Sequence, residues 1–159
     1  MVVRFITGVI AVLLLIAAGW AYHLTSSVIG GREDFQLQVQ GWVQERTTIT
    51  QIDSIDEYRG KESYAVVFGK NEAGTPVIAW LTEEKTVMDR LDLAVPKENV
   101  EEAVKRDYPQ AVVTGMVPGL DGEQRFWEVT LQDHDGRFHY LHYDLYNGQI
   151  LTSYVLSPV

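Results

Sequence analysis

The chain of 159 residues contains no cysteine. This absence excludes thiolate catalysis, disulfide bonds and metal sites built from cysteine. A folded domain outside the cytoplasm would therefore depend on its hydrophobic core alone, which suits a bacterial envelope protein that requires no disulfide.

Basic residues are also few. The chain has 13 Lys and Arg against 22 Asp and Glu, so its net charge is −9. Binding to nucleic acid needs a basic face that neutralises phosphates, and lying flat on anionic lipid needs one too, so the composition argues against both. Hydrophobic residues at 46% and charged residues at 22% are typical of a folded protein and not of a disordered one.

Recognisable catalytic and metal-binding motifs are missing as well. No Gly-rich phosphate loop, nucleophile elbow or Ser-x-x-Lys occurs, so we expect no enzyme activity and no cofactor. His139 and His142 lie three apart on a predicted strand and point to opposite faces, which prevents a shared metal. Asp133-x-Asp135-Gly136 resembles the start of a calcium loop but lacks the later oxygen ligands, so we expect a turn there and no metal site.

The N-terminus holds the longest uncharged apolar run. As a helix, Phe5–Tyr22 would span about 27 Å, close to the ~30 Å of a bilayer core. Arg4 supplies positive charge on the short side, so we predict residues 1–4 in the cytoplasm, a single transmembrane anchor at 5–24, and an extracytoplasmic remainder at the cell membrane. The alternative is a cleaved signal peptide, but Gly19-Trp20-Ala21 is a poor cleavage site and the run exceeds the usual apolar region.

Helical and strand periodicities alternate along the rest of the chain. Residues 33–46 carry apolar side chains at helical spacing, and residues 97–106 form a second such segment opened by Pro96. After the first helix we expect the period to change to two, in a stretch up to Gly60 where Ile49, Ile52 and Ile55 lie among polar residues. Further strands are predicted at 63–68, 76–81, 111–117, 125–132, 137–145 and 149–156.

The two halves repeat this order. A shift of 62 residues aligns, without a gap, Tyr64 with Phe126, Val67 with Val129, Gly74 with Gly136, Ile78 with Tyr140, and Leu81 with Tyr143. We therefore predict an α+β fold, in which the transmembrane helix precedes two tandem helix-plus-antiparallel-sheet units at 33–94 and 95–159. Units this small bury little surface alone, so we expect them to pack together.

The second predicted unit resembles a PepSY-type domain. The matching features are the acidic helix at 97–106, the strand Phe126-Trp127-Glu128-Val129, and the aromatic-Asp-x-x-x-Gly-x-hydrophobic pattern of Tyr143–Ile150. The layout of basic N-terminus, anchor, juxtamembrane helix and two cystatin-like or PepSY-like units resembles the TseB (YpmB-like) family of Firmicutes. The first unit departs from the pattern, since no Asp-x-x-x-Gly turn follows Leu81, and its number of strands stays open.

This resemblance implies a non-catalytic, membrane-anchored extracytoplasmic regulator of cell-wall elongation and peptidoglycan synthesis. Such proteins act by contacting a class B penicillin-binding protein, which is the partner the resemblance implies. The alternative is a PepSY-like or cystatin-like module that binds or inhibits a secreted peptidase.

The predicted strand at 137–145 is apolar on both faces. Phe138, Tyr140 and His142 share one face, and the other carries Leu141, Tyr143 and Leu145. Either both faces are covered, one by the helix and one by the sister unit, or one face is a docking surface. In the second case the candidate partner-binding residues are Phe138, Tyr140 and His142.

Overall fold

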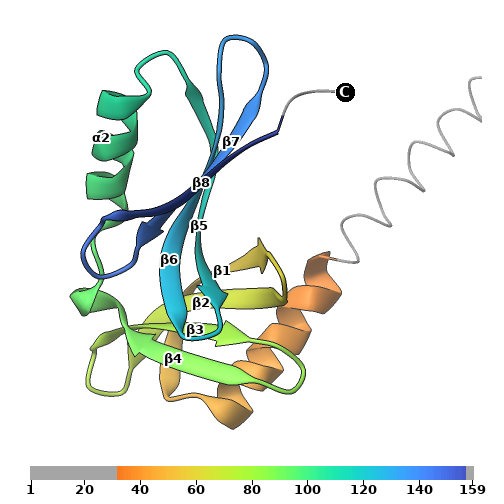
Figure 1. Ribbon diagram of the computed structural model, residues 1–159. Coiled ribbons are helices and arrows are strands. Elements are labelled where there is room, and N and C mark those ends of the chain that lie inside the picture. Colours follow the sequence, from red (N-terminus) through yellow and green to blue (C-terminus); the bar gives the residue numbers. More distant parts are fainter. Residues whose placement is uncertain (1–31, 157–159) are drawn as a thin grey trace, which may run out of the picture. The chain divides into compact units, whose positions relative to one another are not determined.

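The computed structural model describes residues 32–156 (Figure 1). The predicted anchor at 5–24 and the predicted cytoplasmic segment at 1–4 lie outside these residues. Within the described part, no helix is long and apolar enough to cross a membrane. The described residues divide into two units between Gly41 and Trp42, and both sheets lie in the second unit.

A helix runs through residues 32–46, as the spacing of apolar residues predicts. Its final turns lie in the second compact unit, where Val43 is buried. There the guanidinium of Arg46 donates to the backbone carbonyl oxygens of Thr82 and Glu83, at 2.9 and 3.0 Å. Because the donor is charged, these bonds are stronger than neutral ones, and they hold the end of the helix to the turn at 82–85.

Four antiparallel strands form the first sheet, in the order β1-β2-β3-β4. The sequence left the number of strands open. The structure sets it at four, because residues after the turn at 82–85 pair with β3 as a separate strand. The strands are β1 (Ile49–Arg59), β2 (Ser63–Asn71), β3 (Pro76–Leu81) and β4 (Thr86–Arg90).

Two irregularities in β1 explain why its isoleucines recur every three residues and not every two. Ile49, Ile52 and Ile55 oppose Asn71, Gly69 and Val67 of β2, with register shifts after Ile49 and after Ile52. Each shift adds one residue to β1 and so keeps the next isoleucine on the same face. The expectation of a spacing closer to two was wrong here, because periodicity in the sequence does not reveal bulges.

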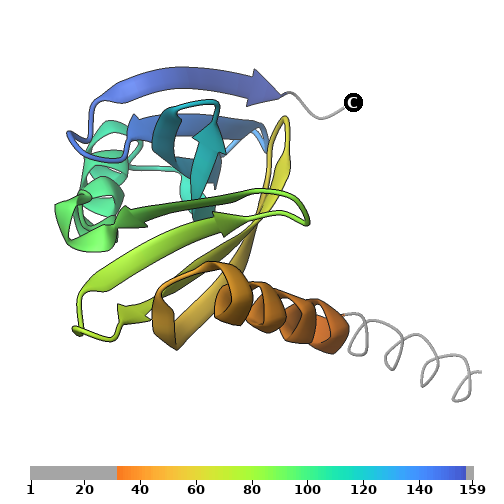
Figure 2. The ribbon, with the colours of Figure 1, turned by 90° about the horizontal axis from the view of Figure 1, so that it is seen from below.

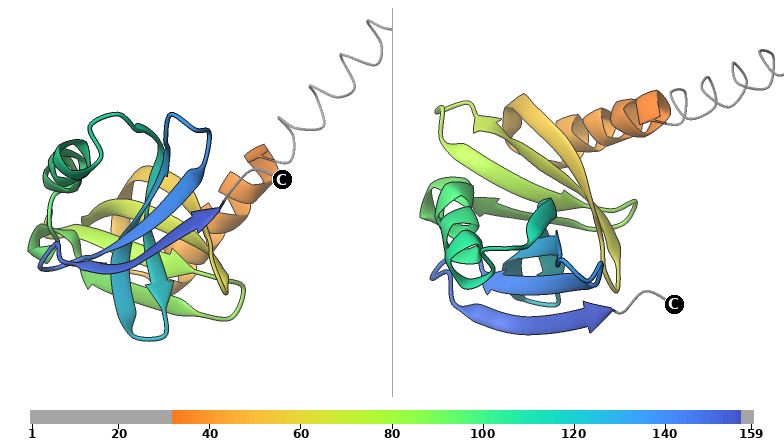
Figure 3. Two further views of the ribbon diagram at one scale, coloured as in Figure 1. Left: turned by 45° about the horizontal axis from the view of Figure 1, so that its top comes forward. Right: turned by 90° about the horizontal axis from the view of Figure 1, so that it is seen from above.

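The short 3₁₀ helix η1 (Leu91–Leu93) follows β4, and the second half begins with helix α2 (Lys97–Asp107). Pro96 precedes α2 as its N-cap and is not its first helical residue. A second antiparallel sheet follows in the order β5-β6-β7-β8, and helix α2 lies along one side of it (Figure 3). Its strands are β5 (Val112–Asp121), β6 (Gln124–Gln132), β7 (Phe138–Asp144) and β8 (Ile150–Leu156).

Strand β5 is longer than the sequence suggests, since it continues past Val117 to Asp121. Pro118 makes the longer strand unexpected, because proline cannot donate to a strand neighbour. An edge strand tolerates this loss, and β5 is an edge strand of its sheet.

The internal repeat is confirmed in the pairing of the central hairpins. In the first sheet Ala65 opposes Leu81 and Lys70 opposes Pro76. Adding 62 to each number gives Trp127 opposite Tyr143 and Gln132 opposite Phe138, which are the pairs found in the second sheet. The same shift therefore describes the sequence match and the strand register of β2-β3 and β6-β7.

One hydrophobic cluster combines residues of both sheets and α2, so the two halves share a core as expected for units of this size. From the first sheet it includes Val66, Ile78 and Trp80, and the Trp80 indole N–H donates to the carbonyl oxygen of Pro118 at 3.0 Å. From the second half it includes residues of α2, β6 and β7, among them Val100, Val104, Trp127, Val129, Leu131, Leu141 and Tyr143.

Candidate binding surface

The two faces of β7 differ in exposure. Leu141 and Tyr143 are buried in the cluster with α2, and Leu145 is buried beyond the end of the strand. On the opposite face Tyr140 and His142 are half-buried, and Phe138 is 37% exposed. Among the described residues, the helix thus covers one face of β7, and the other is left partly open.

Strand β8 widens the open face. Register pairs Phe138 with Leu156, Tyr140 with Tyr154, and His142 with Thr152, so the β8 side chains lie beside the three candidates. Tyr154 and Leu156 are 51% and 58% exposed. We call these six residues of β7 and β8 the β7–β8 surface. The sequence analysis missed the three on β8, although their spacing of two was a usable signal.

His142 is held firmly within the β7–β8 surface. Its Nε2 lies 3.0 Å from a carboxylate oxygen of Glu128 on β6. Its ring stacks on Phe126, with centroids 4.0 Å apart and planes at 14°, and meets Tyr154 edge-on at 5.6 Å. These contacts fix the orientation of His142, so this part of the surface is rigid before any partner arrives.

Tyr58 of the first sheet contacts Phe126, which in turn stacks on His142. Its ring lies edge-on to Phe126 with centroids 5.8 Å apart, and it is almost fully buried. Burial, and then the nearby Glu128 carboxylate, raise the pKa of Tyr58 to about 12, so this phenol stays neutral at physiological pH. Among the described residues, the first sheet thus covers one end of the open face of the second sheet and leaves β7 and β8 partly open.

His139 lies on the other side of β7 from His142, as predicted, and its side chain contacts the turn between β6 and β7. Its Nε2 lies 2.9 Å from Asp133, whose carboxylate also accepts from the backbone N–H of Asp135 and from the backbone and guanidinium of Arg137. The His139 hydrogen bond, followed by those from Arg137, holds the pKa of Asp133 well below its ordinary value. The Asp133 oxygens are therefore occupied by donors of the hairpin that joins β6 to β7.

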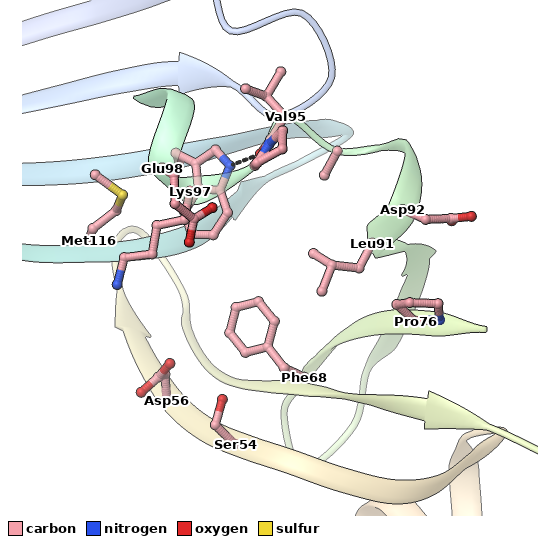
Figure 4. A pocket seen from close by; sticks show the side chains of 13 residues that line it. Ser54, Asp56, Phe68, Pro76, Leu91, Asp92, Val95, Lys97, Glu98 and Met116 are labelled. Carbon is pink, nitrogen blue, oxygen red and sulfur yellow. Dashed lines mark hydrogen bonds between the residues drawn. The ribbon is translucent and has the colours of Figure 1, made fainter. Parts of the chain in front are cut away.

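A cavity of about 520 Å³ lies elsewhere, between the first sheet and the start of α2. Figure 4 shows Phe68 and Leu91 facing into it, with charged side chains such as Asp56 and Lys97 at its margin. Asp92 at this margin accepts two hydrogen bonds from Arg90, at 3.0 and 2.6 Å, so its carboxylate is engaged in an ion pair. The cavity is mostly apolar. It is therefore better suited to accept an apolar side chain than to support acid–base catalysis.

Residues 32–156 contain no group of three His, Asp or Glu side chains close enough together to hold a metal ion. His139 lies beside the carboxylate of Asp133, and His142 lies beside the carboxylate of Glu128.

Comparison with known protein families locates two matches. Residues 42–82 match the family described as "Cell wall elongation regulator TseB-like domain". Residues 94–154 match the family described as "Peptidase propeptide and YPEB domain", or PepSY. The chain carries a TseB-like domain followed by a PepSY domain. Most of the β7–β8 surface, including all three residues suggested by the sequence, lies in the PepSY domain.

One sequence and one solved structure from Bacillus subtilis resemble the chain over most of its length. The "Probable cell wall elongation regulator TseB" of strain 168 is 22% identical over 157 residues, covering 93% of this chain and 92% of the relative. The solved structure of the YpmB protein has a similar fold, with a TM-score of 0.59 and 22% identity, over 69% of this chain and 88% of that one. The resemblance to the TseB (YpmB-like) family is confirmed as a distant homology.

The Asp-x-x-x-Gly turn of the PepSY domain has a clear physical basis. The Asp144 carboxylate accepts from the backbone N–H groups of Tyr146 and Asn147, both at 2.9 Å, and its carbonyl oxygen accepts from Gly148 at 3.0 Å. Gly148 has a φ of +69°, which residues with a Cβ rarely adopt. The pattern that carries the resemblance therefore specifies a turn between β7 and β8, and the β7–β8 surface lies on the strands beside this turn.

Proposed function

We propose that this protein is a non-catalytic, membrane-anchored regulator of cell-wall elongation, which acts by binding a class B penicillin-binding protein outside the cytoplasm. The distant homology to a probable cell wall elongation regulator supports the process. The observation that carries a binding role is the β7–β8 surface, because exposed aromatic and apolar side chains on a rigid sheet are typical of protein interfaces.

The domain limits 33–94 and 95–159 and the anchor at 5–24 are part of this proposal. An anchor would confine the protein and a membrane-bound synthase to the same surface. Tethering raises the effective concentration of each partner near the other, so that an interface of modest affinity suffices. A secreted version without residues 1–24 should therefore fold but lose most of its activity in the cell.

The orientation in the membrane has a direct test. A cysteine introduced at Ser153 should react with a membrane-impermeant thiol reagent in whole cells, and one introduced at Val2 should not, because the chain has no cysteine of its own. Labelling at Val2 alone would reverse the proposed topology.

Binding is tested by charged substitutions in the β7–β8 surface. Phe138→Glu and Tyr140→Glu should abolish co-purification with a class B penicillin-binding protein from crosslinked membranes, since a buried, unpaired carboxylate is costly at an interface. Their melting temperatures should stay close to the original value because both side chains are at least partly exposed. Val112→Glu is a matched control, since Val112 is also an exposed apolar strand residue, at 66%, but lies on β5 at the other edge of the sheet.

Each outcome has a definite meaning. Unfolding of the Phe138 and Tyr140 variants would make these residues part of the core and not of an interface. If the unaltered protein recovers no wall synthase from crosslinked membranes, the regulator proposal fails.

A second candidate function follows from the description of the PepSY family, which includes peptidase propeptides. In this alternative the same module binds or inhibits a secreted peptidase. This alternative would be favoured if the purified chain inhibited an extracellular peptidase. It would also be favoured if depletion of the wall synthase left the cellular role of the chain unchanged.

A further inference from the structure

Strand β8 forms one outer edge of the second sheet. The sheet order is β5-β6-β7-β8, so β8 pairs with β7 on one side only. Figure 2 shows β8 at the end of the row, with no other described element beside its outer side. Along this side, N–H and C=O groups of β8 point outward without a strand neighbour, which makes an edge a template for another extended chain.

The other three sheet edges carry features that hinder such pairing. Strand β1 has two bulges and four charged residues, and β5 has a bulge and Pro118. Strand β4 is only five residues long. Its Asp89 forms an ion pair with Arg125 at 2.5 Å and accepts a hydrogen bond from the Tyr146 hydroxyl at 2.6 Å. Charges, bulges, proline and short length are the usual means by which proteins prevent edge-to-edge association.

Strand β8 has almost none of these features. Its sequence, Ile-Leu-Thr-Ser-Tyr-Val-Leu, contains no charge, no proline and no glycine. One register shift occurs at Leu151, and Thr152–Leu156 is then regular. Four of its side chains are at least half exposed, namely Ile150, Tyr154, Val155 and Leu156. An edge with this composition would favour aggregation unless a partner covers it.

We propose that β8 receives an extended segment of the partner protein as a fifth strand of the second sheet. This inference rests on the binding role proposed above and specifies its geometry. Backbone hydrogen bonds along Thr152–Leu156 would provide much of the affinity, and side chains at alternate positions of the segment would contact Tyr154 and Leu156 on the open face. The segment is therefore apolar at alternate positions, poor in charge and free of proline in its central residues.

Charge favours a different protein over a second copy of this chain. Each copy has a net charge of −9, so association of two copies brings like charges together. The uncharged β8 imposes no such penalty on a neutral or basic segment. Tyr154 and Leu156 also continue the β7–β8 surface, so one partner can pair with the edge and cover the aromatic side chains together.

Photocrosslinking from the full chain in living cells tests the contact. p-Benzoylphenylalanine replaces Ser153 on β8, and in a matched control it replaces Asp53, which is exposed on the bulged edge strand β1. The first position should give a crosslinked product with another protein, and the control should not. The crosslinked peptides are identified by mass spectrometry, with the class B penicillin-binding protein as the expected partner.

Two proline variants then separate backbone pairing from side-chain contact. Successive N–H groups of a strand point alternately to its two sides. Of Thr152→Pro and Ser153→Pro, one therefore removes a bond to β7 and lowers the melting temperature, whereas the other removes an outward donor and preserves it. The variant with the preserved melting temperature should lose at least 10-fold in crosslinking yield from a probe at Val155, while Ser153→Ala, at a position outside the β7–β8 surface, should keep the yield.

Each outcome supports or refutes strand addition, the regulator proposal, or both. Proline-sensitive crosslinks to a penicillin-binding protein support both, and proline-sensitive crosslinks to another protein support strand addition alone. Co-purification of the synthase without crosslinks from β8, or crosslinks that neither proline affects, would refute strand addition and keep the regulator proposal. Crosslinks between two copies of the chain would refute the assignment to a different protein, and the absence of both crosslinks and synthase would refute both proposals.

Discussion

The indole of Trp80 joins the two halves of the protein and offers a quantitative test of their shared core. Trp80 is fully buried on β3, and its N–H donates to the carbonyl oxygen of Pro118 on β5 at 3.0 Å. The substitution Trp80→Phe keeps an aromatic ring in the core but removes the donor and part of the apolar surface. It therefore changes one contact between the halves without introducing a charge or a bulky group.

The expected loss of stability has two parts. Leaving the buried carbonyl oxygen of Pro118 without a donor costs about 1–3 kcal/mol. Loss of roughly 40 Å² of buried apolar surface adds about 1 kcal/mol at ~25 cal/mol per Å². The sum, about 2–4 kcal/mol, is a large share of the ~5–15 kcal/mol that stabilises a typical domain. We expect a fall in melting temperature on the order of 10 °C.

The assay is equilibrium unfolding of the purified chain in urea, followed by far-ultraviolet circular dichroism and by tryptophan fluorescence. Because both sheets contribute to one cluster, both probes should report a single transition at the same urea concentration. Trp127→Phe is the matched control. Trp127 donates to the carbonyl oxygen of Val95 at 3.0 Å, but it also lines the cavity, so water can reach this site and the loss should be smaller, about 1–2 kcal/mol.

An unchanged unfolding midpoint in Trp80→Phe would show that this contact contributes nothing to stability. Two separate transitions in the unaltered protein would refute the shared core, since the halves would then unfold independently.

Two further predictions concern the turns of the second sheet. Gly136 and Gly148 have φ values of +79° and +69°, so replacement of either by Val should cost about 1 kcal/mol or more, measured by urea unfolding, while Gly115→Ala, at a site without positive φ, should be nearly neutral. Equal stability of all three variants would show that the turns tolerate a Cβ. The pKa of Asp133 is lowered by His139 and Arg137, so its contribution to stability is present above the ordinary pKa of about 4 and is lost as the pH falls below it. Asp133→Asn should therefore be less stable than the unaltered protein at pH 7, and the gap should close in acid; a gap independent of pH would contradict the assigned ionisation.

The sequence was sufficient for much of the local structure. The order of helices and strands could be predicted because apolar residues recur at 3.6 or 2 residues wherever one side of an element is buried. Turn positions could be predicted too, since a glycine with positive φ, such as Gly136 or Gly148, is required where a hairpin reverses. The 62-residue repeat in the sequence also matches the structure, because equal spacing between two strands gives both central hairpins the same register.

Several features depended on contacts between segments far apart in the chain. The bulges of β1 place Ile49, Ile52 and Ile55 on one face, and they exist only in relation to β2. The open side of β7 could not be distinguished from its covered side by composition, since Tyr140 and Leu141 are both hydrophobic. Only packing against α2 and the position of Tyr58 decide which side remains exposed.

The candidate binding surface shows the same division. The sequence by itself identified Phe138, Tyr140 and His142 as residues sharing one face, because side chains alternate along any strand. The tertiary structure added Tyr154 and Leu156 beside them and placed β8 at the edge of the sheet. Strand order and exposure arise from long-range pairing, which leaves no periodic signal in a single sequence, whereas the alternation of faces is a property of each strand alone.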